Sequence, residues 1–402
     1  MGEWQQYRLI DVLDALIDYR GKTPKKTSFG VPLITAKIIK NGRIYPPTEY
    51  ISFSDYDSWM VRGFPKIGDV VLTTEAPLGE VAQLDNATIA LAQRVVTLRG
   101  KSGVLDNAYL KYYFLSNVGK QRLKARETGT TVTGIKQSEL KEVIVDVPPY
   151  DTQQKIASIL SSLDDKIEVN RKINENLEQQ AQALFKSWFV DFEPFKNGEF
   201  VESELGMIPK GWRVGKLSEI ADYVNGLAMQ KFRPQNNEQG LPVLKIKELG
   251  QGSFDANTEQ CSPSLIGEKY IIHDGDIIFS WSGTLMVKIW CGGLCGLNQH
   301  LFVVVPKNYP KWFVYLWTLY HLDNFIRIAK DKAVTMGHIK RGELDKALVA
   351  IPDKDEMEKC DALIAPIFKQ IISNEIESRR LASLRDTLLP KLMSGELKVN
   401  EL

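Results

Sequence analysis

The chain has 402 residues, of which 44% are hydrophobic and 25% are charged, and its formal net charge at pH 7 is +1. This is an ordinary globular composition with room for two or three domains. A net charge close to zero excludes a global basic field, so any surface for nucleic acid has to be local. The sequence has no apolar run long enough to cross a bilayer, and its beginning, MGEWQQYRLI, does not resemble a signal peptide. We therefore expect a cytoplasmic protein with no membrane partner.

Residues 1–149 are predicted to form an α/β domain whose loops suit DNA. The turn at 20–26 is basic, which suits contact with phosphates. A Thr-Glu-Ala-Pro loop follows a predicted strand, and a Gln-Arg pair begins another; Gln reads adenine and Arg reads guanine in the major groove. A basic helix face then leads into 129–136, where hydroxyls, backbone N–H groups and a lysine can hold phosphates. The candidates are Lys22, Thr23, Lys25, Thr74, Gln93, Arg94, Arg126, Thr130, Thr131 and Lys136. The alternative for each residue is a solvated loop face.

The stretch IVDVPPYD at 144–151 allows two interpretations. In adenine methyltransferases, a Pro-Pro-aromatic turn follows a polar residue, which binds the target amine while the aromatic ring stacks on the flipped base. Here the residue before the prolines is Val147, which has no acceptor. The other interpretation is a β-branched strand that two prolines end, with Asp151 as the cap of a helix. The first interpretation would make the chain an enzyme and the second would not.

A helical segment follows this strand at 151–190, and another occupies 355–394. In both, apolar residues recur at alternating steps of four and three, which is the seam of a coiled coil. Asn170 and Asn374 hold matching core positions, where buried amides usually fix register. Pro366 is expected to kink the second helix or to mark its true start. The seam residues are Ile156, Leu160, Leu163, Ile167, Asn170, Leu177 and Leu184, then Ile364, Ile367, Ile371, Asn374, Leu381 and Leu388.

We expect the two helices to pair antiparallel, because so long a seam usually packs on another helix. Two unrelated amphipathic helices, each packed on its own domain, are the alternative. A helix of about 40 residues is roughly 60 Å long, and half-sites on one face of DNA lie about 34–36 Å apart or a multiple of that. The helix pair would place one domain at each end of a spacer that suits a target with two half-sites.

The second domain, at 196–352, offers counterparts of the first candidate surface. They are Lys245, Ser282, Thr284, Gln299, His300, Lys330, Thr335, His338 and Lys340. The four cysteines also lie in this half of the chain, and Cys291 and Cys295 have a loose metal-ligand spacing. One pair supplies too few ligands for zinc, so we expect buried reduced thiols and no metal site. The sequence shows no cofactor loop and no nuclease carboxylate cluster, and we predict neither catalytic nor cofactor-binding residues.

An internal repeat joins these observations. TGIKQSELKEVIVDVPPYD at 133–151 matches GHIKRGELDKALVAIPDKD at 337–355 without a gap. Further pairs lie upstream: 30–39 with 240–249, 67–79 with 274–286, and 91–98 with 297–305. The second copy of VPPYD loses one proline and the aromatic but keeps the pattern of strand and cap. This favours the structural interpretation of that stretch over methyl transfer.

Several motifs follow one another in a specific order. They are the repeated segments at 129–148 and 333–352, QQKIA at 153–157, ALFKSWFVDFEPFK at 183–196, SELGMIPKGW at 203–212 and LLPKLMSGEL at 388–397. In these motifs, and over essentially its whole length, the chain resembles the DNA-specificity subunit of type I restriction–modification systems. The second helical region lacks the aromatic SWFVDF tail, and Ser-Trp-Ser-Gly replaces Thr-Glu-Ala-Pro in the second domain.

The resemblance implies an α+β fold with two α/β target-recognition domains, at 1–149 and 196–352, each reading one half of an asymmetric DNA sequence. It implies helical spacer regions at 150–195 and 353–402, related by a pseudo-two-fold axis. The implied partners are double-stranded DNA, two modification subunits that use S-adenosylmethionine, and restriction subunits that use ATP and Mg. The chain itself would be non-catalytic. Two other classes stay open: a self-contained methyltransferase or nuclease with a fused recognition domain, and a coiled-coil scaffold without a DNA role.

Overall fold

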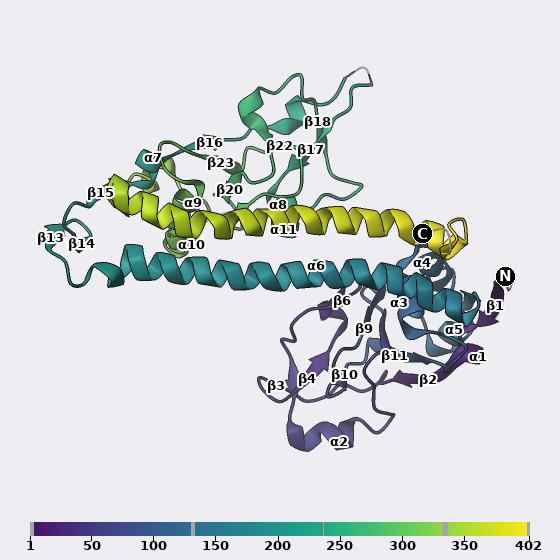
Figure 1. Ribbon diagram of the computed structural model, residues 1–402. Coiled ribbons are helices and arrows are strands. Elements are labelled where there is room, and N and C mark those ends of the chain that lie inside the picture. The colour runs from purple at the N-terminus through teal and green to yellow at the C-terminus, as the bar shows by residue number, and fades with distance from the viewer. Residues whose placement is uncertain (1–3, 130–132, 236, 332–336, 400–402) are drawn as a thin grey trace. The chain divides into compact units, whose positions relative to one another are not determined.

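The computed structural model describes residues 4–129, 133–235, 237–331 and 337–399. The chain divides into two compact units. Unit 1 comprises Met1–Lys166 with Leu381–Leu402, and unit 2 comprises Ile167–Arg380. Each unit holds one α/β domain and a part of each long helix (Figure 1). No helix in the described part of the chain is long and apolar enough to cross a membrane.

The domain of unit 1 is built on a four-stranded antiparallel sheet. Its order is β2 (Leu13–Asp18), β11 (Val95–Gly100), β8 (Val70–Thr74), β9 (Leu78–Gln83). Both faces of β8 are covered: Val70 and Leu72 pack with the aromatic residues of α3 (Asn107–Leu115), whereas Val71 packs toward a second, small sheet. The order of the small sheet is β10 (Ala90–Leu91), β4 (Val31–Ile34), β7 (Tyr50–Ile51), β3 (Lys26–Thr27). The continuous apolar run of β8 follows from this burial on two sides.

The domain of unit 2 repeats this plan. Its larger sheet has the order β16 (Ala221–Asn225), β23 (Leu301–Pro306), β20 (Ile277–Ser280), β21 (Met286–Ile289). Its small sheet has the order β18 (Gln260–Cys261), β17 (Leu241–Leu244), β22 (Cys295–Leu297), β19 (Ile271–Ile272). Ile277 and Phe279 pack toward the helices α9 (Lys311–Tyr320) and α10 (Leu322–Asp331), and Ile278 packs on the opposite side. The duplication predicted from the sequence is therefore a duplication of fold.

Near its start, each domain has a strand that pairs with the strand before the long helix. In unit 1, β1 (Gln5–Arg8) is antiparallel to β12 (Ile144–Val147). In unit 2, β15 (Arg213–Lys216) is antiparallel to β24 (Leu348–Ile351). The interpretation of VPPYD as the end of a strand and the start of a helix is confirmed, because α6 (Tyr150–Phe185) follows β12 directly.

The predicted cap at Asp151 is wrong, because α6 begins at Tyr150 and Asp151 lies inside its first turn. The connection is held instead by Gln153, which is fully buried. Its amide donates to the carbonyl of Pro148 at 2.8 Å, and its oxygen accepts the N–H of Asp106 at 2.9 Å. In the second copy the cap is present: the Asp353 carboxylate accepts the N–H of Glu356 at 2.9 Å.

The two long helices, α6 and α11 (Lys354–Ser394), run antiparallel in both units (Figure 1). In unit 2, Asn174 donates to the carbonyl of Ile371, whereas the earlier Asn170 reaches Ser378. All the predicted seam residues are buried or half-buried. Pro366 does not mark the start of the second helix: it lies exposed inside α11, which begins twelve residues earlier at Lys354.

The aromatic tail SWFVDF ends α6 and anchors it in unit 2. After Phe185 the helix continues as a π-helical turn, Lys186–Val190. This turn buries Phe189, whose ring centroid lies 5.5 Å from that of Phe313 and 5.6 Å from that of Trp212. The motif therefore has a packing role, since its central aromatic fills the core of the second domain.

Candidate nucleic-acid interface

One main-chain joint recurs in both domains and organises the candidate loops. In unit 1, Glu75 forms an isolated β-bridge with Gly134, and the N–H of Ile135 donates to the carbonyl of Thr74 at 2.9 Å. These bonds connect the loop after β8 to the segment that contains Lys136. The loop itself is closed by the hydroxyl of Thr73, which donates to the carbonyl of Pro77 at 2.6 Å.

The matching joint in unit 2 uses the residues that the repeat predicts. Ser282 forms an isolated bridge with His338, and the N–H of Ile339 donates to the carbonyl of Trp281 at 3.2 Å. The hydroxyl of Ser280 donates to the carbonyl of Thr284 at 2.8 Å, as Thr73 does in unit 1. The main-chain bonds are thus shared between the domains, while the side chains of the bridged pairs differ.

The structure brings several candidates of the first domain together. The hydroxyl of Thr23 donates to the Gln93 amide oxygen at 3.3 Å, although the two residues are far apart in sequence. Beside them, the Arg94 guanidinium lies 3.4 Å from the Glu75 carboxylate, and both side chains are substantially exposed. Lys136 is exposed at the start of the short helix α5 (Gln137–Lys141). These groups can donate to bases and phosphates from one side of the joint.

Other candidates of the first domain have different surroundings. Thr74 is only 2% exposed, because β8 is covered on both faces. Arg126 is half-buried and forms an ion pair with Glu139 at 3.0 Å. Lys22 and Lys25 are exposed in the turn between β2 and β3. Thr130 and Thr131 lie outside the described residues.

The candidate surface of the second domain includes an indole ring, that of Trp281, which follows β20 in the Ser-Trp-Ser-Gly loop. Trp281 stacks on Phe302 with 5.6 Å between ring centroids, and the rings of His300 and His338 lie at 6.2 and 6.3 Å. The Trp281 N–H donates to the amide oxygen of Asn225 at 3.0 Å. In the sequence, Trp281 follows a predicted strand, and the repeat pairs its loop and the segments that contain His300 and His338 with the candidate loops of the first domain. Such aromatic rings can contact base edges or the thymine methyl group.

The remaining candidates of the second domain differ in their surroundings. Gln299 Nε2 lies 3.4 Å from His300 Nε2. Ser282 is 4% exposed, and Lys245 forms an ion pair with Glu259 at 2.7 Å. Three further candidates are exposed: Thr284, Lys330 and Lys340. Thr335 lies outside the described residues.

A buried charge cluster joins the first domain to both long helices within unit 1. The Asp164 carboxylate of α6 accepts hydrogen bonds from Tyr112 at 2.6 Å and from Arg385 of α11 at 2.7 Å, and Lys111 lies at 3.3 Å. Burial alone would raise the pKa of Asp164, but Lys111, Tyr112 and Arg385 together lower that pKa below its usual value. Burial also lowers the pKa of Lys111, against the opposing charge of Asp164.

The cysteines match the prediction of buried thiols at three of four positions. Cys261, Cys295 and Cys360 are buried, Cys291 is half-buried, and all four are free. Burial raises the pKa of the Cys291 thiol to about 12 and that of Cys261 to about 11. Among the described residues, no group of three or more His, Cys, Asp or Glu side chains could hold a metal ion.

The family described as the type I restriction modification DNA specificity domain matches the chain twice, at residues 1–179 and 209–386. The chain belongs to this family. The two matches coincide with the two copies of the fold. The structural repeat is thus the repeat of a specificity domain.

Relatives of the type I specificity family match the chain over its full length. It is 32% identical over 421 residues to the specificity subunit of the type I restriction enzyme MjaIX of Methanocaldococcus jannaschii, covering all of this chain and 95% of the relative. It is 24% identical to the HindI specificity subunit of Haemophilus influenzae, covering 99% and 100%. The crystal structure of the S subunit of a type I system from M. genitalium is similar in fold, with a TM-score of 0.54, 16% identity and coverage of 97% and 96%.

These relatives are named as specificity subunits, which are the non-catalytic components of type I restriction enzymes. This chain holds two specificity domains and two long helices. The predicted role as a specificity subunit, and the α+β fold class with its internal repeat, are therefore confirmed.

Proposed function

We propose that each α/β domain reads one half of a bipartite, asymmetric DNA target. The observation that carries the proposal is the repeated main-chain joint, Glu75 with Gly134 and Ser282 with His338. The joint holds the same loops in both domains but presents different side chains, as expected for two readers of different sequences. Arg94 and Gln93 are the base-reading candidates in the first domain, whereas Lys136 and Lys340, both exposed, are the candidates for phosphate contact.

The antiparallel helices, in this proposal, set the spacing between the half-sites and dock two modification subunits. Those subunits would methylate adenines with S-adenosylmethionine, and restriction subunits, where the host has them, would add ATP- and Mg-dependent cleavage. The chain would supply sequence choice and assembly in the cytoplasm. In this proposal, the domains at 1–149 and 196–352 read the half-sites. The helical regions at 150–195 and 353–402 set the spacing and dock the modification subunits.

A genome-wide map of N6-methyladenine tests the function. Cells that express this chain with its neighbouring methyltransferase are compared with cells that lack only this chain. A bipartite motif that depends on the chain supports the proposal and reveals both half-sites and the gap. The same motif in both samples would mean that the methyltransferase selects its own target. If neither sample shows a motif and the complex fails to bind DNA, the result would favour a coiled-coil scaffold without a DNA role.

A further inference from the structure

The basic residues of α4 (Asn117–Lys124) and of the turn after it differ in whether they form ion pairs. Arg122 and Arg126 each pair with a carboxylate of their own domain, at 2.8 and 3.0 Å. Lys120 and Lys124 are exposed, and neither pairs with a carboxylate within the residues that the structure describes. The arginines therefore stabilise the domain, and the lysines stay available for a ligand.

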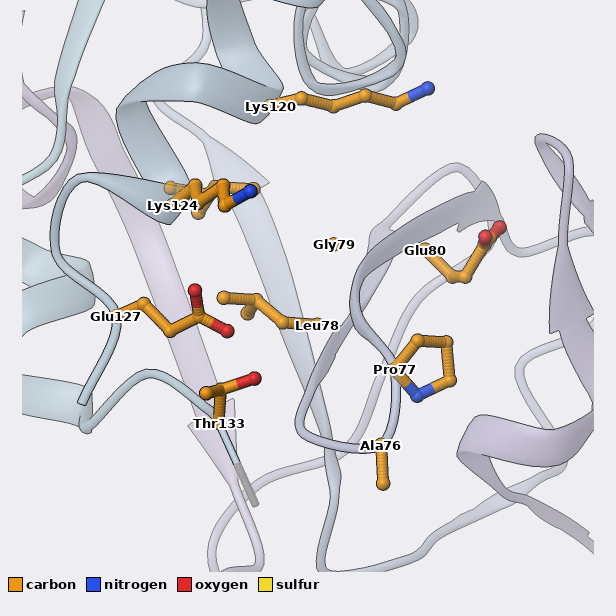
Figure 2. A pocket seen from close by; sticks show the side chains of 10 residues that line it. Ala76, Pro77, Leu78, Gly79, Glu80, Lys120, Lys124, Glu127 and Thr133 are labelled. Carbon is orange, nitrogen blue, oxygen red and sulfur yellow. The ribbon is translucent and has the colours of Figure 1, made fainter. Parts of the chain in front are cut away.

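Both lysines line a pocket of about 610 Å³ in unit 1 (Figure 2). One wall is α4, from which the two side chains extend. The opposite wall is the turn from Ala76 to Glu80 that connects β8 to β9, with Pro77 facing the lysines across the pocket. Leu78 and Leu123 contribute apolar surface, and Glu127 and Thr133 complete the lining. The pocket is thus an open recess with cations at its edge and apolar side chains within.

The pocket adjoins the candidate DNA surface through two chain connections. Ala76 directly follows Glu75, and Thr133 directly precedes Gly134; Glu75 and Gly134 form the β-bridge of the joint. The pocket edge and the candidate DNA surface therefore lie next to each other within unit 1. This continuity favours one occupant for the pocket edge, the sugar–phosphate backbone of the same DNA.

The charges of the pocket limit how an anion can sit in it. The exposed ammonium groups of Lys120 and Lys124 lie toward solvent, where a lysine acts as a point charge for phosphate. The Glu80 carboxylate already accepts the N–H of Asn41 at 2.8 Å. Glu127 is half-buried and has no cationic partner among the described residues, so it repels an anion that enters further.

We propose that Lys120 and Lys124 hold a backbone phosphate of DNA beside the first half-site, and that Glu127 restrains this contact to the pocket edge. The inference rests on the proposed function and adds a phosphate site to it. In the gapless frame of the repeat, which pairs 133–151 with 337–355, Lys120 and Lys124 correspond to Asn324 and Ile328 of α10. The second domain has neither lysine at these places, so the phosphate site belongs to the first domain.

The test is a salt series of DNA binding by the full chain, assembled with its cognate modification subunits. Each lysine–phosphate contact contributes about 0.9 to the slope of log affinity against log salt. K120Q/K124Q should lower that slope by up to about two, equally for a duplex with both half-sites and for a random-sequence duplex. E127Q should act in the opposite direction and tighten binding at every salt concentration. K346Q/K354Q is the charge-matched control, since both lysines are exposed and lie near Glu343 and Glu358.

The outcomes separate this inference from the function on which it rests. Failure of the unaltered complex to bind DNA would overturn both. Binding by the unaltered complex, with an unchanged slope in K120Q/K124Q, would overturn the phosphate site and leave the function intact. A changed target sequence in K120Q/K124Q would mean that the lysines contact bases, which also overturns it. Opposite shifts in K120Q/K124Q and E127Q support it, because a general folding defect cannot tighten binding.

Discussion

Asn374 of α11 donates a hydrogen bond to Asn174 of α6, with 2.8 Å between Nδ2 and Oδ1, and both side chains are buried. Asn174 also donates to the main-chain carbonyl of Ile371 at 3.1 Å. Asn170, one turn earlier in α6, reaches the Glu377 carboxylate at 2.7 Å. The helix pair therefore has a polar centre in which the Asn170, Asn174 and Asn374 amide groups all donate across the pair in one register, which explains why the seam is interrupted by amides at this point.

Replacing Asn374 with leucine should destabilise the chain by about 1–3 kcal/mol, because the buried Oδ1 of Asn174 then loses its donor. N174L/N374L should recover most of that loss, since both polar partners are removed together. Urea unfolding measures the free energies, with N176L as a control at an exposed position of α6. A single variant as stable as the parent would show that the amide pair has no structural role.

Lengthening both helices by one heptad should widen the gap between half-sites. Seven helical residues add about 10.5 Å, or about three base pairs. The insertions belong after Asn170 and after Asn374, because these positions face each other in the antiparallel pair. The readout is the methylation motif, which should keep both half-sites and gain the extra gap. Methylation at the original spacing by the lengthened chain would rule out a spacer role, and insertion in α6 alone is the mispaired control.

Asp164→Asn should destabilise the chain at neutral pH by about 3 kcal/mol, because Lys111 is left buried without its counter-charge. The folded-state pKa of Asp164 is lowered, so its stabilisation is present above the unfolded-state pKa and is lost as pH falls through the folded-state value. Parent and variant should therefore converge in acid and differ at pH 7. Urea unfolding across this range measures the difference, and D165N, at the exposed neighbouring position, should track the parent throughout.

Arg94→Ala and His338→Ala should each alter one half of the target. Arg94 lies at the joint of the first domain and His338 at the joint of the second, and both are exposed. Loss of a base contact costs about 1–3 kcal/mol of discrimination at one position. Sequencing of methylated sites should show one relaxed base pair in the first half-site for R94A and in the second for H338A. Relaxation of both halves by one variant would contradict the assignment of one half-site to each domain.

Periodicity and repetition predicted most of the fold, because both report burial directly. The heptad steps located Ile156, Leu160 and Ile371 in the helix seam, and each is buried. Local chemistry was a weaker guide. Thr74 resembles a loop hydroxyl in the sequence, but long-range packing covers both faces of its strand. Arg126 resembles a free cation until the fold brings Glu139 to it.

The pocket lysines illustrate the same difference between local and long-range information. The sequence shows four basic residues at alternate positions, Lys120, Arg122, Lys124 and Arg126, and charge alone does not distinguish the two lysines from the two arginines. The distinction arises because the fold places acidic partners next to the arginines only. Ion pairs between distant segments are set by tertiary structure and have no periodic signature in the chain.

The joint between Glu75 and Gly134, repeated by Ser282 and His338, consists of main-chain contacts. The same joint therefore forms in the second domain although Ser282 and His338 replace Glu75 and Gly134. A DNA-reading surface built in this way can accept substitutions without loss of folding. The DNA sequence that it recognises can then change while the backbone arrangement stays the same. The two domains share this main-chain joint and differ in the residues that form it, so one chain contains two sequence variants of the same scaffold.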